Sequence, residues 1–247
     1  MLKENLMKRK NIQTIQLELE QGQRGLVIGQ TGSGKTYFST RLMMYLPLPV
    51  LIYNSKDDET FSSFYSDILK QTSNIQEALA LLDEYCYVNY VPPSDELLDK
   101  DKQSNVLNML YERQNLSIYF DEVGQIYQTA GFLNILTRGR SRKITTLMAT
   151  QRPVSISRFA FTESQKFYVF KIVDKRDREV IANFIPYFNK EKIQQKYTFD
   201  FYNAENDYFK ENIKSSSIIW HEDERMAVLN EECKKKRPIV SKILDIF

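Results

Sequence analysis

A run of eight residues combines the residue types that bind a chain of phosphates. It reads Gly29, Gln30, Thr31, Gly32, Ser33, Gly34, Lys35 and Thr36, and it satisfies G-x-x-x-x-G-K-[ST] at every fixed position. Glycines lack a Cβ and can adopt positive φ, so successive backbone N–H groups can turn toward phosphate oxygens at the start of the following helix. The Lys35 ammonium would then reach the β and γ phosphates, and the Thr36 hydroxyl would ligate Mg²⁺. The run therefore predicts a P-loop that binds ATP with Mg²⁺.

A second group of candidate residues is a pair of acids at the end of an apolar run. Residues 116–120 are mostly apolar and lead into Asp121 and Glu122. Taken alone, such a run most often ends in an acid that caps a helix. About 85 residues downstream of a P-loop, we favour a catalytic role, in which Asp121 holds Mg²⁺ through a water and Glu122 polarises the attacking water. This spacing leaves room for an additional strand between the P-loop strand and the acidic strand.

Two further polar segments follow the acids. Residues 144–149 predict a buried strand that ends in Thr150-Gln151-Arg152-Pro153. Gln151 would lie beside the acidic strand, where an uncharged polar side chain can sense the γ phosphate or orient water; the alternative is a loop residue that caps local backbone. Residues 137–143 carry a basic cluster that is either a solvated loop or functional.

The elements that position these residues can be predicted from hydrophobic periodicity. Residues 12–19 alternate apolar and polar side chains, and Gln21-Gly22-Gln23 would turn them back into the P-loop strand as a small N-terminal hairpin. The other predicted strands cover 25–28, 50–54, 87–91, 116–120, 144–149 and 167–170, and a late hairpin covers 197–209. Predicted helices begin near Lys35 and cover 61–69, 75–82, 94–115, 125–136 and 174–184. The pattern is that of an α/β fold with a mainly parallel central sheet flanked by helices and a C-terminal β/α extension.

Composition fits one folded α/β domain over residues 1–247, with a core of about 10–180 and an extension of about 181–247. The 247 residues are 42% hydrophobic and 27% charged, which is ordinary globular content. Cys86, Cys233 and the single histidine cannot assemble a metal site, and we expect a reducing cytoplasm. The longest apolar run, residues 42–53, is too short for a membrane span, and no secretory signal is visible. The net charge of +2 excludes no class of nucleic-acid partner.

The four motifs together resemble a known family. GQTGSGKT, VLIYNSKDD, SIYFDEVG and LTRGRSRKITTLMATQRP are similar to segments of the FtsK/HerA class of DNA-pumping ATPases, and most similar to the small genome-packaging ATPases of tailless viruses with an internal membrane. The resemblance covers residues 10–180. It implies a RecA-like P-loop NTPase core of the ASCE type. It also implies a homo-oligomeric ring, a hexamer or pentamer, that threads double-stranded DNA without reading its sequence.

The same resemblance implies site roles and surroundings. Lys35, Thr36, Asp121, Glu122 and Gln151 would act as described above, and an arginine would reach the neighbouring subunit's nucleotide. Arg138, Arg140 and Arg142 are competing candidates for that arginine, with Arg140 preferred, and Lys166 occupies a further position where larger relatives can place it. Capsid vertex proteins would be partners, and the location would be the host cytoplasm or the virion vertex.

Two other functions remain open at this stage. A P-loop protein of virion assembly or export would act on protein and could use its nucleotide as a switch. A cellular HerA-like ATPase would process DNA. The absence of a membrane span and of added domains favours genome packaging over both, and this preference rests on analogy.

Overall fold

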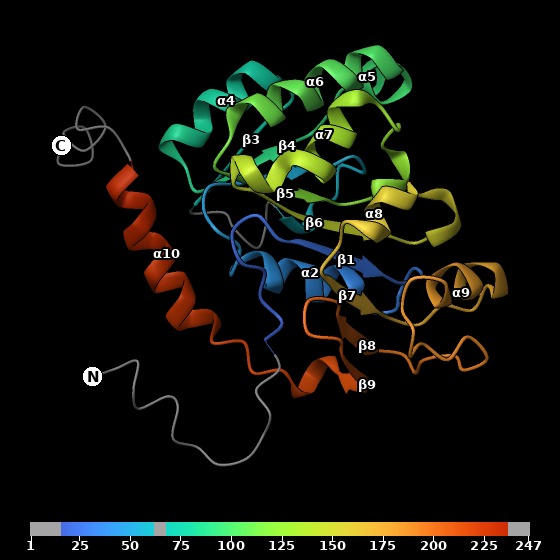
Figure 1. The fold of residues 1–247 in the computed structure, drawn as a ribbon. Coiled ribbons are helices and arrows are strands. Elements are labelled where there is room, and N and C mark those ends of the chain that lie inside the picture. Colours follow the sequence, from blue (N-terminus) through green and yellow to red (C-terminus); the bar gives the residue numbers. More distant parts are fainter. Residues whose placement is uncertain (1–15, 62–67, 237–247) are drawn as a thin grey trace.

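The computed structural model describes residues 16–61 and 68–236 of the chain (Figure 1). Its strands are β1 (Arg24–Ile28), β2 (Val50–Tyr53), β3 (Leu69–Thr72), β4 (Tyr87–Tyr90), β5 (Leu116–Phe120), β6 (Ile144–Thr150), β7 (Lys166–Val169), β8 (Thr198–Asn203) and β9 (Tyr208–Lys214). Its α-helices are α2 (Lys35–Met43), α4 (Ile75–Glu84), α5 (Ser94–Leu98), α6 (Lys100–Arg113), α7 (Ala130–Arg138), α8 (Arg158–Thr162), α9 (Lys175–Ala182) and α10 (Glu222–Lys236). Short 3-10 turns are η2 (Val123–Gln125), η3 (Gly139–Arg142), η4 (Pro153–Ser155) and η5 (Ser215–Ser217).

The strands form one sheet in the order β3-β4-β2-β5-β6-β1-β7-β8-β9. Neighbours from β3 to β7 pair in parallel, whereas β8 and β9 add to the edge in antiparallel pairs. An additional strand, β6, separates the P-loop strand β1 from the acidic strand β5, as the spacing predicted. The mainly parallel sheet and the C-terminal β/α extension are therefore confirmed.

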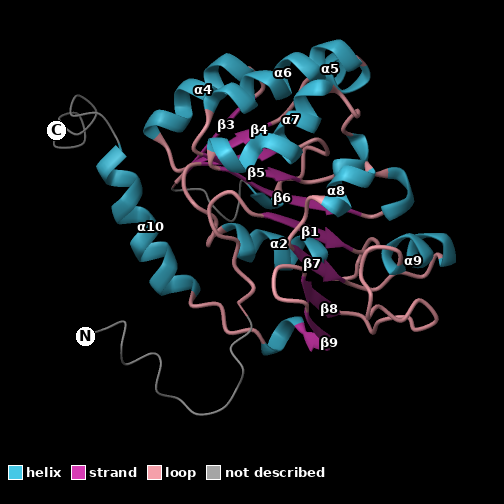
Figure 2. Cartoon of the chain, viewed as in Figure 1, coloured by secondary structure: helices cyan, strands magenta, loops and turns pink. Residues whose placement is uncertain are grey.

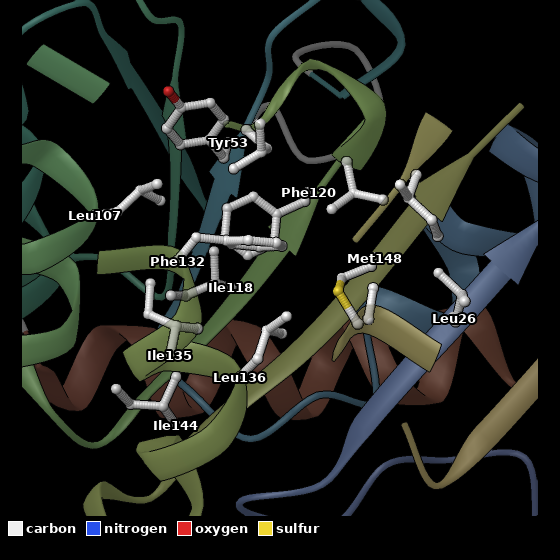
Figure 3. Close-up of a cluster of buried hydrophobic side chains, with 14 of the residues drawn as sticks. Leu26, Tyr53, Leu107, Ile118, Phe120, Phe132, Ile135, Leu136, Ile144 and Met148 are labelled. Carbon is white, nitrogen blue, oxygen red and sulfur yellow. The ribbon is translucent and has the colours of Figure 1, made fainter. Parts of the chain in front are cut away.

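Helices cover both faces of the sheet (Figure 2). Both faces carry apolar side chains that must be covered. In β1, for example, Leu26 and Ile28 belong to one buried cluster, while Val27 belongs to another on the opposite face. Side chains of α4 and of α6 to α9 contribute to the first cluster, and side chains of α2 and α10 to the second. Figure 3 shows part of the first cluster, including Phe120 of β5 and Phe132 of α7. The two rings pack edge to face, with their centroids 5.8 Å apart. A sheet buried on both faces requires nearly continuous apolar strands, which these segments have.

Local capping explains where helix boundaries differ from the predicted ones. The segment predicted as one helix over 94–115 is two, because the Asp99 carboxylate accepts the backbone N–H groups of Asp101 and Lys102 and starts α6. The helix predicted from residue 125 begins later, at Ala130, where Thr129 caps it. Residues 62–67, which hold most of the helix predicted over 61–69, lie outside the described residues.

The predicted N-terminal hairpin is wrong in its described part. Residues 16–20 are not a strand, and β1 has no free side for them because β6 and β7 pair with it on both sides. Leu17 and Leu19 instead bury their side chains in the second cluster. The ammonium of Lys166 donates hydrogen bonds to the backbone carbonyls of Gln16 and Glu18. The alternation of apolar and polar residues therefore reflects a segment that packs on the face of the sheet without being a strand. Residues 12–15 lie outside the described part of the chain.

Cys86 and Cys233 form a disulfide across 147 residues, with their Cα atoms 5.4 Å apart. Cys86 directly precedes β4, and Cys233 lies on the buried side of α10. The cysteine content therefore gives no support to a reducing compartment, because disulfides persist mainly in oxidising ones. The bond fastens α10 to the sheet, and its wide sequence separation left no signal to predict it.

Candidate nucleotide-binding site

The P-loop connects the carboxyl end of β1 to the first turn of α2 and adopts the backbone its glycines allow. Gly34 caps α2 with φ 103°, a left-handed conformation that side chains rarely adopt. A Cβ on Gly29 would lie 2.7 Å from the Cβ of Phe170, so only glycine fits there. The end of β6 also holds the start of the loop, since the Gly29 N–H donates a hydrogen bond to the Thr150 carbonyl at 3.0 Å. This conformation leaves the backbone N–H groups at the start of α2 available to an anion.

A cavity of about 360 Å³ opens over this loop and collects most of the predicted site residues. Its walls are formed by Gln30, Thr31, Gly32, Gly34, Lys35, Thr36, Tyr37, Lys56, Asp58, Asp121, Gln151 and Tyr197. Because β1, β2, β5 and β6 are parallel, their carboxyl ends meet at one edge of the sheet, and the cavity lies there. Four separate motifs of the sequence thus reach a single site.

The two acids lie side by side with a lysine that was not predicted to contact them. Asp121 is 1% exposed and Glu122 is 9% exposed. The Lys56 ammonium, at the carboxyl end of β2, lies 3.0 Å from Glu122 Oε2 and 3.9 Å from Asp121 Oδ2. Lys56 thus supplies positive charge to both carboxylates. The sequence placed Lys56 after a buried strand, but the pairing of β2 with β5 that creates the contact is visible only in the fold.

Gln151 connects the P-loop to the acidic strand. Its side-chain Oε1 accepts a hydrogen bond from the Thr31 hydroxyl at 2.9 Å, and its backbone N–H donates to Glu122 Oε1 at 3.2 Å. Gln151 therefore lies beside the acidic strand, as predicted, and it also contacts the phosphate-binding loop. Glu122 is held at both carboxylate oxygens, by Lys56 on one side and by Gln151 on the other.

The charges around the cavity depend on one another. Burial lowers the pKa of Lys35, and the nearby ammonium of Lys56 lowers it further, whereas Asp121 and Glu122 raise it. Burial likewise raises the pKa of Asp121, while Lys56 and Lys35 oppose that increase. A site that holds a buried lysine beside a second, partly exposed lysine is suited to a polyanion, because negative phosphate oxygens favour the charged form of both groups.

The residues present fit a magnesium ion. Asp121 Oδ2 is buried and accepts no hydrogen bond from any described residue, so it has capacity for a further partner. Thr36 lies in the wall of the same cavity. Within residues 16–61 and 68–236, no cluster of three or more histidine, cysteine or acidic residues could hold a metal by itself. Mg²⁺ is bound by one or two protein oxygens together with substrate phosphates and waters, and the Asp121 carboxylate and the Thr36 hydroxyl would supply such oxygens.

The basic residues considered for a neighbouring site lie elsewhere. Arg140 is exposed in η3 and packs on Gly22 at the amino ends of β1 and β6, the edge of the sheet opposite the P-loop. Arg142 binds Glu112 at 2.8 Å and lies over the ring of Tyr111. Lys166 is only 1% exposed, which excludes it from reaching another subunit.

Fold and site together define a P-loop nucleoside triphosphatase in which an additional strand separates the P-loop from the acid pair. Comparison with known proteins narrows this class. The chain is 29% identical over 177 residues to the DNA packaging ATPase P9 of Enterobacteria phage PRD1, covering 70% of this chain and 74% of P9. No protein-family model matches the chain. The resemblance to small viral packaging ATPases is therefore confirmed by a sequence relative.

Solved structures show the same fold. The genome packaging NTPase B204 of Sulfolobus turreted icosahedral virus 2 in complex with AMPPCP superposes with a TM-score of 0.65 at 14% identity, covering 78% of this chain and 97% of B204. Its complex with ATP-gammaS gives a TM-score of 0.64 over 79% of this chain and 99% of B204, also at 14% identity. The P-loop ATPase fold predicted from the motifs is thus confirmed.

The first testable prediction separates phosphate binding from catalysis. Lys35→Ala should lose MgATP binding while the protein stays folded, because the lysine serves the phosphates. Glu122→Gln should bind ATP but hydrolyse it at least about 100-fold more slowly, since an amide cannot accept the water's proton. Calorimetric binding and steady-state turnover of both variants test this. Unchanged hydrolysis by folded Lys35→Ala would contradict the assignment, as would equal loss of binding in both variants.

The second prediction concerns Lys56. Lys56→Met should lower the free energy of unfolding of the nucleotide-free protein by about 1–2 kcal/mol, because two buried carboxylates lose a partly exposed counter-charge. MgCl₂ should restore part of that loss by supplying positive charge at Asp121, and the charge-conserving Lys56→Arg should lose little. Urea unfolding with and without MgCl₂ measures this. Equal stability of all three proteins would mean that Lys56 is not the acids' counter-charge.

Proposed function

We propose that this protein is an ATP-hydrolysing DNA translocase that packages a viral genome into a preformed capsid. The observation that carries the proposal is the similarity to P9 over most of both chains. The site supports hydrolysis independently, because a base candidate, a phosphate-binding lysine and a polar residue between them line one cavity or contact its walls. No helix within the described residues is long and apolar enough to cross a membrane.

The residues of the cavity suggest a division of roles in hydrolysis. Lys35 and the backbone N–H groups at the start of α2 hold the phosphates, and Thr36 and Asp121 hold Mg²⁺. When bound, the ion neutralises charge that develops on the phosphate oxygens. Glu122 accepts the proton of the attacking water, and Gln151 lies close enough to hold that water or the γ phosphate. The Lys56 ammonium donates to Glu122 Oε2 at 3.0 Å, so this contact must open before that oxygen can accept a hydrogen bond from the water along the same direction.

Arg140 is the preferred residue to act on a neighbour's nucleotide. It is exposed at the amino ends of β1 and β6, while the P-loop lies at their carboxyl ends. A head-to-tail ring joins two different surfaces of adjacent subunits, and in this proposal they are the two opposite edges of the sheet. Such a ring would bring Arg140 of one subunit toward the cavity of the next. Arg142 is a weaker candidate because Glu112 and Tyr111 already hold its guanidinium group.

The expected partners follow from packaging. Double-stranded DNA would be held through its phosphates, and capsid vertex proteins would anchor the ring in the infected cell's cytoplasm or at the virion vertex. A motor that moves any genome must contact the backbone without a base code, because sequence readout would stall it at unfavourable steps.

The third prediction tests the DNA substrate. The ATPase rate should rise with double-stranded DNA of any sequence. That stimulation should fall steeply with salt, because log K decreases by about 0.9 per phosphate contact for each log unit of salt. Steady-state ATPase assays with unrelated duplexes at several salt concentrations measure both effects. An active oligomer that is stimulated by coat protein and neither binds nor responds to DNA would favour a protein-assembly function instead.

The fourth prediction tests Arg140. Arg140→Ala should slow hydrolysis by about 10³ to 10⁵-fold with nearly unchanged ATP affinity, as loss of an arginine that stabilises the transferred phosphoryl group does elsewhere. Mixing Arg140→Ala with Lys35→Ala subunits should restore some activity, because a mixed interface pairs an intact cavity with an intact arginine. Arg142→Ala is the matched control and should retain turnover. Mixed rings without any recovery would move the assignment to Arg138.

A further inference from the structure

The segment before β8 contacts the P-loop directly. Tyr197 donates its backbone N–H to the carbonyl of Ser33 at 3.2 Å. Its side chain packs on Gly34, where an added Cβ would lie 3.0 Å from Tyr197 Cδ1. This part of the C-terminal extension therefore forms a wall of the nucleotide cavity. The sequence predicted no site residue in the C-terminal extension.

The backbone of Tyr197 is held in a conformation that tyrosine rarely adopts. Its φ is 63°, in the left-handed region, where a side chain crowds the backbone. Two hydrogen bonds fix it there, since the Ser215 N–H donates to the Tyr197 carbonyl at 2.9 Å while Ser33 accepts from the other side. Such conformations persist only where the surroundings enforce them, and they cluster at ligand sites. Despite these two fixed points, the residue is 54% exposed.

The position of Tyr197 along the cavity identifies the part of a nucleotide that it would meet. Gln151 contacts Thr31 of the loop and Glu122, the proposed base. We therefore assign the γ phosphate to this end of the cavity. Backbone groups of the loop and of the first turn of α2 cradle the α and β phosphates. Tyr197 contacts the loop at Ser33 and Gly34, whereas Gln151 contacts it at Thr31, and the half-exposed Tyr37 follows the loop in α2. The two tyrosines are therefore the aromatic groups of the cavity wall that an apolar base could meet.

We propose that Tyr197 is the platform on which the base of the bound nucleotide stacks, with Tyr37 as the second aromatic wall. A half-exposed aromatic ring beside a phosphate cradle matches the chemistry of a nucleoside triphosphate, which is charged at one end and flat and apolar at the other. One face of Tyr37 is already covered by Arg41, whose guanidinium carbon lies 3.5 Å from the ring centroid. Lys196 lies over the Tyr197 ring at 4.8 Å, so a cation also flanks this platform.

Stacking on a tyrosine gives affinity without selecting one base, because every base has a π face. The inference deepens the proposed nucleotide-dependent function and rests on it. It predicts that ATP and GTP both lose affinity when the ring is removed, while a ligand consisting of phosphates alone does not. That difference distinguishes a base platform from a residue that merely supports the P-loop.

The test compares ATP with inorganic tripolyphosphate, both with Mg²⁺, by calorimetric titration. Tyr197→Gly removes the ring and tolerates the left-handed backbone, so it should fold without the strain that alanine would retain. It should bind ATP roughly 5- to 150-fold more weakly, the range that stacking on an aromatic side chain represents, and bind tripolyphosphate like the unaltered protein. Tyr197→Phe keeps the ring and should bind ATP with nearly the original affinity. The matched control is Tyr187→Ala, a tyrosine of the same extension that is 48% exposed and outside the cavity.

Three outcomes would overturn the inference. Equal weakening of ATP and tripolyphosphate in Tyr197→Gly would make the residue a support for the loop. Unchanged ATP affinity in that variant would remove Tyr197 from the site, while binding that depends on Lys35 would leave the proposed function intact. If the unaltered protein binds neither ligand, the nucleotide-dependent function itself fails, which the other two outcomes do not imply.

Discussion

Charged groups compensate one another at the carboxyl edge of the sheet, and this compensation limits how the strands that carry them can be ordered. Lys35 and Asp121 are almost completely buried, and each would be costly to ionise there alone. Lys56 lies within 4 Å of both acids, so the positive and negative groups stabilise one another across the cavity. This arrangement requires the ends of β1, β2 and β5 to coincide. Only parallel strands deliver three carboxyl ends to one edge, and parallel strands in turn require crossover helices on the faces of the sheet.

The sequence predicted those site residues whose position depends on a single contiguous segment. Residues 29–36 determine their own turn, because the glycines and the following helix act locally. Asp121, Glu122 and Gln151 end apolar runs, and the ends of buried parallel strands must meet. Lys56 followed such a run as well, but its ion pairs depend on β2 lying directly beside β5. The order of the strands in the sheet depends on contacts between segments far apart in the sequence, so it cannot be predicted from the hydrophobic periodicity of one segment.

The errors have equally specific causes. Alternation over 12–19 predicted a strand, yet an extended segment packed on a sheet face also buries every second side chain, as Leu17 and Leu19 do. The helix predicted over 94–115 is divided because Asp99 offers its carboxylate to the backbone of the next residues, a local competition that hydrophobic periodicity does not register. The sequence predicted Tyr197 only as the start of a hairpin, because its left-handed backbone is fixed by hydrogen bonds to Ser33 and Ser215, which are not its neighbours in the sequence.

The two edges of the sheet carry different kinds of charge, and this asymmetry bears on assembly. The carboxyl edge carries a recessed cavity with paired lysines and acids, while the amino edge exposes Arg140 beside the turn at Gly22. A two-fold symmetric interface pairs one surface with the same surface of the partner, so an interface made by one edge of the sheet would not join it to the opposite edge. A head-to-tail contact joins two different surfaces and can therefore bring the amino edge of one subunit to the carboxyl edge of the next. If that arrangement closed into the proposed ring, each subunit would have one neighbour that contributes Arg140 to its cavity and one to whose cavity it contributes Arg140, so the proposed sites would be linked in one direction around the ring.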